Sequence, residues 1–159
     1  MRLLRLRIAA VSAAATALPS NAGADEAAGA FCAELKTVVA AAQERPAFRS
    51  MPADVEVPAL GFQRCLVIDL FEPTFICVED FTDAAARWSS LREWISDCLP
   101  GALPYRPRGA SPPRADEQVA RLRHGDAAIL IHEAGYANLP QRYVALHVEA
   151  VPRRERRRR

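Results

Sequence analysis

Residues 65–99, CLVIDLFEPTFICVEDFTDAAARWSSLREWISDCL, carry the strongest structural signal in this chain. Two short apolar runs, Cys65–Leu70 and Phe75–Val78, are rich in the β-branched and aromatic residues that favour strands. The turn between them, Phe71-Glu72-Pro73-Thr74, contains proline and polar residues, as short turns do. The pattern predicts a β-hairpin.

A helix is expected to follow this hairpin directly. Thr82 or Asp83 can cap its first turn, and Pro100-Gly101 ends it. The apolar residues recur at the spacing of an amphipathic helix and share one face; they are Phe81, Ala84, Trp88, Leu91, Ile95, Cys98 and Leu99. This face should be buried in the core.

The chain before residue 65 predicts another amphipathic helix, from Phe31 to about Glu44. Pro46 ends it, and the proline-containing stretch 46–60 is expected to be an ordered, irregular connection. Residues 25–30 are small and polar, so we expect a frayed N-terminus there.

The chain after residue 100 predicts a loop followed by a second hairpin. Residues 101–114 contain four prolines and several arginines, as loops do. For residues 115–123 the periodicity leaves helix and strand open. Ala127–Glu133 and Arg142–Ala150 are expected to form the second hairpin, with its turn over residues 135–140.

The resulting order, α-β-β-α-β-β, predicts an α+β fold. We expect two helices on one face of an antiparallel sheet, within a single domain over residues 25–152. That length is sufficient to bury a core of its own.

Residues 1–24 have the layout of an export signal. Three arginines precede an alanine-rich apolar stretch over residues 8–18, and Ala22-Gly23-Ala24 is a small-residue cleavage site. The apolar stretch is shorter than the about 20 residues that a membrane span needs. We therefore expect a signal peptide, its removal, and a soluble protein that is periplasmic or secreted.

Four cysteines in an exported chain predict two disulfides. A helix over residues 82–98 is roughly 24 Å long, which should separate Cys98 from the end of the hairpin that holds Cys65 and Cys77. Because a disulfide tolerates only about 4.4–6.8 Å between Cα atoms, we predict the pairs Cys65–Cys77 and Cys32–Cys98. The first pair requires a three- or five-residue turn, or a bulge, because side chains alternate along a strand.

The formal charge of +2 conceals two oppositely charged parts. Residues 25–152 carry 12 basic and 18 acidic side chains, a net charge of −6, whereas the tail 153–159 (RRERRRR) holds six arginines. The acidic body argues against nucleic acid as a partner, because nucleic-acid-binding domains usually show a basic face. We expect a disordered, solvated tail. Its arginines can attract anionic surfaces such as lipid headgroups, lipopolysaccharide phosphates or an acidic protein; the alternative, which we favour, is a tail without a selected role.

His132 and His147 are the candidates for a metal site. In the predicted second hairpin the two imidazoles share a face as diagonal neighbours, about 7–8 Å apart between backbones, and Glu149 follows on the same face. Two imidazoles and a carboxylate can hold zinc or copper. A strict ligand motif such as His-Glu-x-x-His is absent, so we favour ordinary strand positions and predict neither a metal nor another cofactor.

Trp94 is the candidate interface residue, together with Arg87 and Arg92. It falls at the edge of the apolar stripe of the helix over residues 82–98, and tryptophan and arginine are enriched at protein interfaces. The alternative interpretation is a boundary residue that covers the rim of the sheet.

No catalytic constellation is recognisable in the sequence. A Gly-x-Ser-x-Gly elbow is absent, the seven glycines are scattered, and the neighbouring acids Glu79-Asp80 and Asp116-Glu117 would point to opposite faces of a strand. We therefore predict a non-catalytic protein-interaction module, such as an inhibitor, an immunity-type protein or an envelope assembly factor. The alternative is a metal-binding protein or an enzyme that uses His132 and His147.

Overall fold

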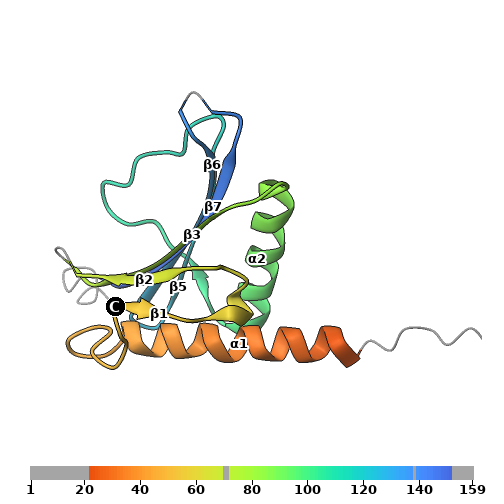
Figure 1. Cartoon of the computed structure of the whole chain (residues 1–159). Coiled ribbons are helices and arrows are strands. Elements are labelled where there is room, and N and C mark those ends of the chain that lie inside the picture. The colour runs from red at the N-terminus through yellow and green to blue at the C-terminus, as the bar shows by residue number, and fades with distance from the viewer. Residues whose placement is uncertain (1–21, 70–71, 138, 152–159) are drawn as a thin grey trace, which may run out of the picture.

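The computed structural model describes residues 22–69, 72–137 and 139–151 (Figure 1). Within these residues the chain forms two α-helices, one 3-10 helix and seven strands. They are α1 (Ala22–Ala42), β1 (Asp54–Val55), η1 (Pro58–Leu60), β2 (Cys65–Ile68), β3 (Thr74–Asp80), α2 (Ala84–Cys98), β4 (Leu103–Pro104), β5 (Gln118–His124), β6 (Ala127–Gly135) and β7 (Arg142–Ala150).

The strands form one antiparallel sheet in the order β1-β2-β3-β7-β6-β5-β4. Both predicted hairpins are present, and β3 of the first pairs with β7 of the second, for example Cys77 with Leu146. The predicted α+β class is confirmed. The predicted element order was incomplete, because β1, β4 and β5 add further strands at the two edges of the sheet.

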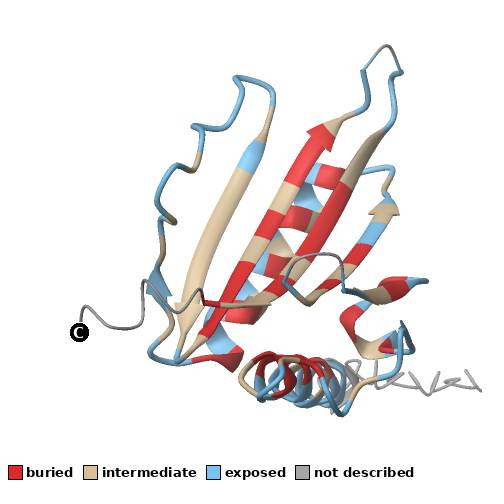
Figure 2. Cartoon of the chain, turned by 90° about the vertical axis from the view of Figure 1, so that its left-hand side faces the viewer, coloured by how far each residue is buried: buried red, intermediate tan, exposed pale blue. Residues whose placement is uncertain are grey.

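The core lies between the helices and one face of this sheet. Figure 1 shows α2 beside the central strands and α1 across one end of the sheet, and Figure 2 looks at the opposite face, with α2 behind the strands. The central strands bury alternate side chains toward the helices, as the two-residue period of a strand requires. These side chains are Phe75, Cys77, Ile129, Ile131, Leu146 and Val148, each at most 1 % exposed.

Three expected boundaries were wrong. Residues 25–30 are not frayed but belong to α1, because the alanine and glutamate residues there are good helix formers. The connection 46–60 contains β1 and η1, and the loop 101–114 contains β4. The structure also resolves two open alternatives: β5 is a strand, and Asp83 caps α2 by accepting a hydrogen bond from the Ala86 amide at 3.0 Å.

Both predicted disulfides are confirmed. Cys32 in α1 is bonded to Cys98 at the end of α2, with 5.1 Å between the Cα atoms. Cys65 and Cys77 are bonded directly opposite each other in the β2–β3 ladder, with 4.2 Å between their Cα atoms. Ile68 pairs with Thr74, so five residues connect the strands. An odd number of connecting residues is needed for Cys65 and Cys77 to point to the same face of the hairpin.

The structure tests the predicted export only in part. Two disulfides are compatible with a secreted or periplasmic protein, and none of the helices that the structure describes is long and apolar enough to cross a membrane. The tail 153–159 and residues 1–21 lie outside the described residues. The signal peptide and the anionic contacts of the tail therefore stay predictions.

The two disulfides should contribute unequally to stability. Cys32 and Cys98 are 66 residues apart in sequence, and Cys65 and Cys77 are 12 apart. Because a longer closed loop restricts the unfolded chain more, the double variant Cys32→Ala/Cys98→Ala should lose about 4 kcal/mol of unfolding free energy and Cys65→Ala/Cys77→Ala about 3 kcal/mol. Urea denaturation of both variants measures this order, and a larger loss in the second variant would contradict it.

Candidate binding surface

One face of the sheet carries no helix, and we call it the helix-free face. The ladder register places its side chains in two central rows that cross the sheet from β2 or β3 to β5, flanked by the row Ile68, Thr74, Glu149, Ala128 and Arg123 on one side and by Asp80, Tyr143 and Ala134 on the other. One central row is Leu66, Ile76, His147, Leu130 and Arg121, and the other is Val78, Ala145, His132 and Val119. Most of these side chains are apolar, although they point away from the core.

Apolar side chains on this face remain partly open to solvent. Val78 is 42 % exposed and Ile68 is 37 % exposed, and both lie close to Ile76 on the same face. Single exposed apolar residues are ordinary on a protein surface, whereas a contiguous group of them usually marks an interaction site. The β2–β3 side of the helix-free face is therefore the best candidate for a binding surface.

A hollow of about 470 Å³ lies in this face. Its walls come from β3, β6 and β7 and from the turn after β6, and they include Ile76, Val78, His132, Tyr143 and His147. The rings of Tyr136 and His132 both contact Tyr143, with ring centres 5.0 Å and 5.6 Å apart. Aromatic and apolar walls with few polar groups are typical of sites that receive apolar groups.

Two side chains that line this hollow have polar neighbours outside it. The Tyr136 hydroxyl donates a hydrogen bond to Asp80 Oδ1 at 2.7 Å, and this bond raises the pKa of Tyr136. Glu117 Oε1 lies 3.9 Å from His132 Nε2, which is buried and has no hydrogen-bond partner in the described part of the chain. Tyr136 and His132 both line the hollow, so these contacts connect its walls to Asp80 and, through His132, to the neighbouring loop that carries Glu117.

The two histidines lie on one face, as the hairpin predicted. Burial, together with the smaller effect of the nearby His132, lowers the pKa of His147 to about 4. His147 is therefore neutral near pH 7. Glu149 also faces this side, beside Ala128 rather than beside His132. Among the residues that the structure describes, no group of three or more His, Cys, Asp or Glu side chains could hold a metal ion.

The candidate interface residues on α2 lie elsewhere and have packing partners. Trp94 is half-buried against Phe31 of α1, with ring centres 5.1 Å apart. Arg92 is exposed and lies over the Trp88 ring at 5.5 Å. These contacts give Trp94 the role of covering the junction of the two helices, and its part in an interface stays a prediction.

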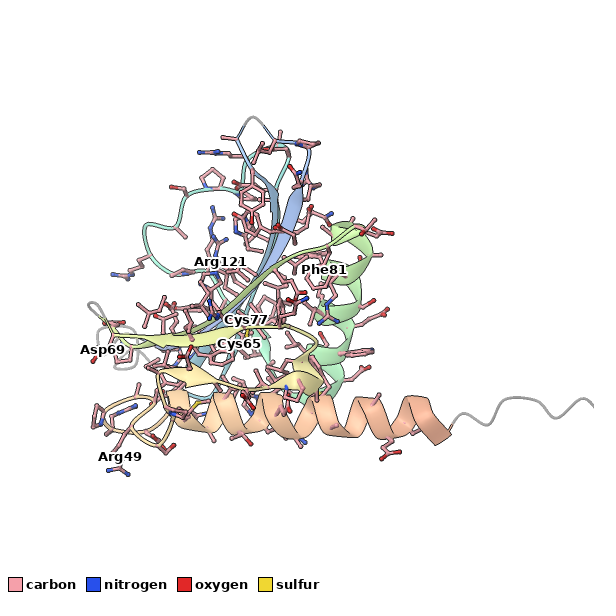
Figure 3. The ribbon with its side chains drawn as sticks, in the orientation of Figure 1. Arg49, Cys65, Asp69, Cys77, Phe81 and Arg121 are labelled. Atoms are coloured by element: carbon pink, nitrogen blue, oxygen red, sulfur yellow. A yellow bond between two sulfur atoms is a disulfide. The ribbon has the colours of Figure 1, made fainter. Side chains whose placement is uncertain are left out.

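Arg87 connects α2 to the end of η1 and to the residues that follow it. Its guanidinium donates hydrogen bonds to the Leu60 and Gly61 carbonyls and lies 5.3 Å from the rings of both Phe62 and Phe81. Figure 3 shows Phe81 beside α2. Burial lowers the pKa of Arg87, and Glu79 partly offsets this effect. Arg87 thus stabilises the fold through contacts that no sequence spacing indicates.

The sequence contains a signal for the helix-free face that our interpretation did not use. In the runs Cys65–Ile68 and Phe75–Val78, apolar residues occupy the odd and the even positions and do not alternate with polar residues. Such continuous runs are typical of strands whose two faces are both covered. In this chain helices cover only one of the two faces.

A substitution at Gly61 should show whether Arg87 is fixed. A Cβ atom there would lie 2.6 Å from Arg87 Nη2, and φ is +71°. Gly101 also has a positive φ but open space around it, so Gly101→Ala should cost about 1 kcal/mol for the backbone alone. Gly61→Ala should cost about 2 kcal/mol or more, because it also displaces a half-buried guanidinium. Equal losses in urea denaturation would show that Arg87 moves aside freely.

Acid should destabilise the protein through His147. An unfolded chain binds a proton at His147 near pH 6.5, whereas the folded protein does so only near pH 4. The unfolding free energy should therefore fall by up to about 3 kcal/mol as the pH drops from about 6.5 to about 4. His147→Gln should remove this part of the dependence. The matched variant His124→Gln, on the opposite face of the sheet, should keep the full pH dependence of the unfolding free energy. The same pH dependence in His147→Gln as in the unaltered protein would refute the role of His147.

Searches against protein-family models, curated proteins and solved structures find no match for this chain. Its function therefore has to be argued from the surface that the fold presents.

Proposed function

We propose that this chain is an exported, non-catalytic protein-interaction module whose helix-free face binds a partner protein. The partial exposure of Ile68 and Val78 beside Ile76 carries this proposal. Burying an apolar side chain of this size contributes about 1.5–3 kcal/mol, so a partner that covers these side chains would gain free energy on binding. The partner is expected to present an apolar surface that fits the hollow of about 470 Å³.

The export part of the proposal rests on the sequence of residues 1–24 and on the two disulfides. Cleavage after Ala24 would remove the first three residues of α1. Phe31 and Leu35, which are fully buried, would keep their places. Loss of the signal segment is thus compatible with the folded core in the periplasm or outside the cell.

Capture from the envelope of the native host tests the proposal. The bait is the chain with and without residues 153–159, so that binding through the arginine tail can be separated from binding through the folded body. We expect one protein at near-stoichiometric yield with both baits. Val78→Asp should reduce the yield about tenfold or more, because it places a charge in an apolar contact.

Ser89→Asp is the matched control, since Ser89 is exposed on α2 and away from the helix-free face. It should leave the yield unchanged. The same yield from Val78→Asp as from the unaltered chain would refute the helix-free face as the site. Stoichiometric metal in the untagged protein, lost in a His132→Ala/His147→Ala variant, would favour the metal-binding alternative.

A further inference from the structure

The edge of the sheet at β5 is incompletely paired. β4 pairs only with Leu122 and Arg123, and the Tyr105 amide then donates to the Arg121 carbonyl at 3.0 Å. Beyond this point the described part of the chain provides no strand next to Gln118–Ala120 on that side. Four of the seven residues of β5, Gln118–Arg121, thus extend past the end of the β4 ladder.

The backbone of Val119 faces the open side of this edge. Backbone groups alternate in direction along a strand, so the N–H and C=O of Val119 point the same way as the Arg121 carbonyl. Apart from the ladder with β6, the structure records no backbone hydrogen bond of Val119 to any described residue. The opposite edge is better covered, because β1 pairs with Cys65 and Leu66, and the Val67 amide donates to the Ala53 carbonyl.

A proline-rich loop runs beside this edge without completing the sheet. Figure 2 shows residues 105–117 alongside β5. Two hollows, of about 340 Å³ and about 270 Å³, lie between the loop and the sheet. Both are lined by Val119, Arg121 and the loop segment Ser111–Pro113. Pro112 and Pro113 have no N–H to donate, and the loop forms no ladder with Gln118–Ala120, so it borders a groove.

The groove is the basic part of an acidic body. Residues 105–123 hold five arginines and two acids, a net charge of +3, so the rest of the stretch 25–152 carries −9. Arg106 and Arg121 line the hollow at the edge. One of the two acids, Glu117, is already engaged, because its carboxylate accepts a hydrogen bond from the Arg114 amide. Charge complementarity therefore favours an acidic occupant.

We propose that the β5 edge binds an extended, acidic segment of the partner protein as an additional strand. The segment would exchange backbone hydrogen bonds with Val119 and place its carboxylates near Arg106 and Arg121. Strand addition of this kind takes its affinity from the main chain and its specificity from alternate side chains. This inference rests on the proposed function in taking the occupant to be part of a partner protein, but it uses the β5 end of the helix-free face and not the partly exposed apolar side chains Ile68, Ile76 and Val78 at its β2–β3 side.

The test uses a fluorescent octapeptide of alternating valine and glutamate as the probe and the full chain as the receptor. We expect saturable binding that weakens with salt. A peptide N-methylated at every second residue should bind about tenfold or more weakly, because it cannot donate to the edge. Equal binding by the N-methylated peptide or by a valine–lysine peptide would overturn the proposal. Binding weaker than about 1 mM would also overturn it and would show that the loop only shields the edge.

Two charge-reversal variants test whether the peptide binds in the groove. Figure 3 shows Arg121 on the sheet and Arg49 in the connection beyond α1, so the two variants change the charge equally at distant places. Arg121→Glu should weaken peptide binding about tenfold or more, and Arg49→Glu should leave it unchanged. Equal effects of the two variants would show that the peptide responds to net charge alone and would refute the groove.

The same peptide separates this inference from the proposed function. Val78→Asp should leave peptide binding intact while partner capture is lost, since Val78 lies on β3 and does not line the groove. Partner capture that survives Arg121→Glu at full yield would overturn the strand-addition inference and leave the proposed function standing. Peptide binding by a protein that captures no partner would overturn the proposed function.

Discussion

The pairing of β3 with β7 is the interaction on which the rest of this structure depends. Thr74–Asp80 aligns with Tyr143–Glu149 and joins two hairpins, far apart in sequence, into one sheet. Its register also sets the two faces. Cys77 and Leu146 point toward the helices, so Ile76 and His147 must point away from them. A slip of one residue would exchange the two faces, whereas the Cys65–Cys77 disulfide fixes the register of β3 with β2.

Helices on only one side give the molecule an asymmetric surface. The Cys32–Cys98 disulfide and the Phe31–Trp94 contact fix both helices to each other on the covered side. The other side presents apolar strands, and the loop 105–117 follows the edge of β5. His132 lines both the large hollow and one hollow under this loop. The helix-free face and the β5 groove are thus neighbouring parts of one continuous surface.

Local patterns predicted much of this fold. The hairpins and the capped helix α2 followed from residue spacing over short distances, and the cysteine pairs followed from the expected lengths and directions of these elements. The β3–β7 pairing and the identity of the open face could not be predicted in this way. Apolar residues occupy both odd and even positions of β2 and β3, so the pattern does not mark one face, and β3 pairs with a strand that is far away in the sequence. Strand β5 was ambiguous because alanine and arginine suit helices as well. The partners of Arg87 and Trp94 come from η1 and α1, which no spacing within α2 indicates.

The central claim is that a partner contacts the side of the sheet without helices. Site-specific photocrosslinking in the native host tests it most directly, with the crosslinker placed in turn at Val78, at Arg121 and at Ser89. Crosslinks from Val78 and Arg121 to the same protein, and none from Ser89, are the result that this account predicts. Crosslinks from Ser89 on α2, with none from the two sheet positions, would contradict it and return the interface to the helix.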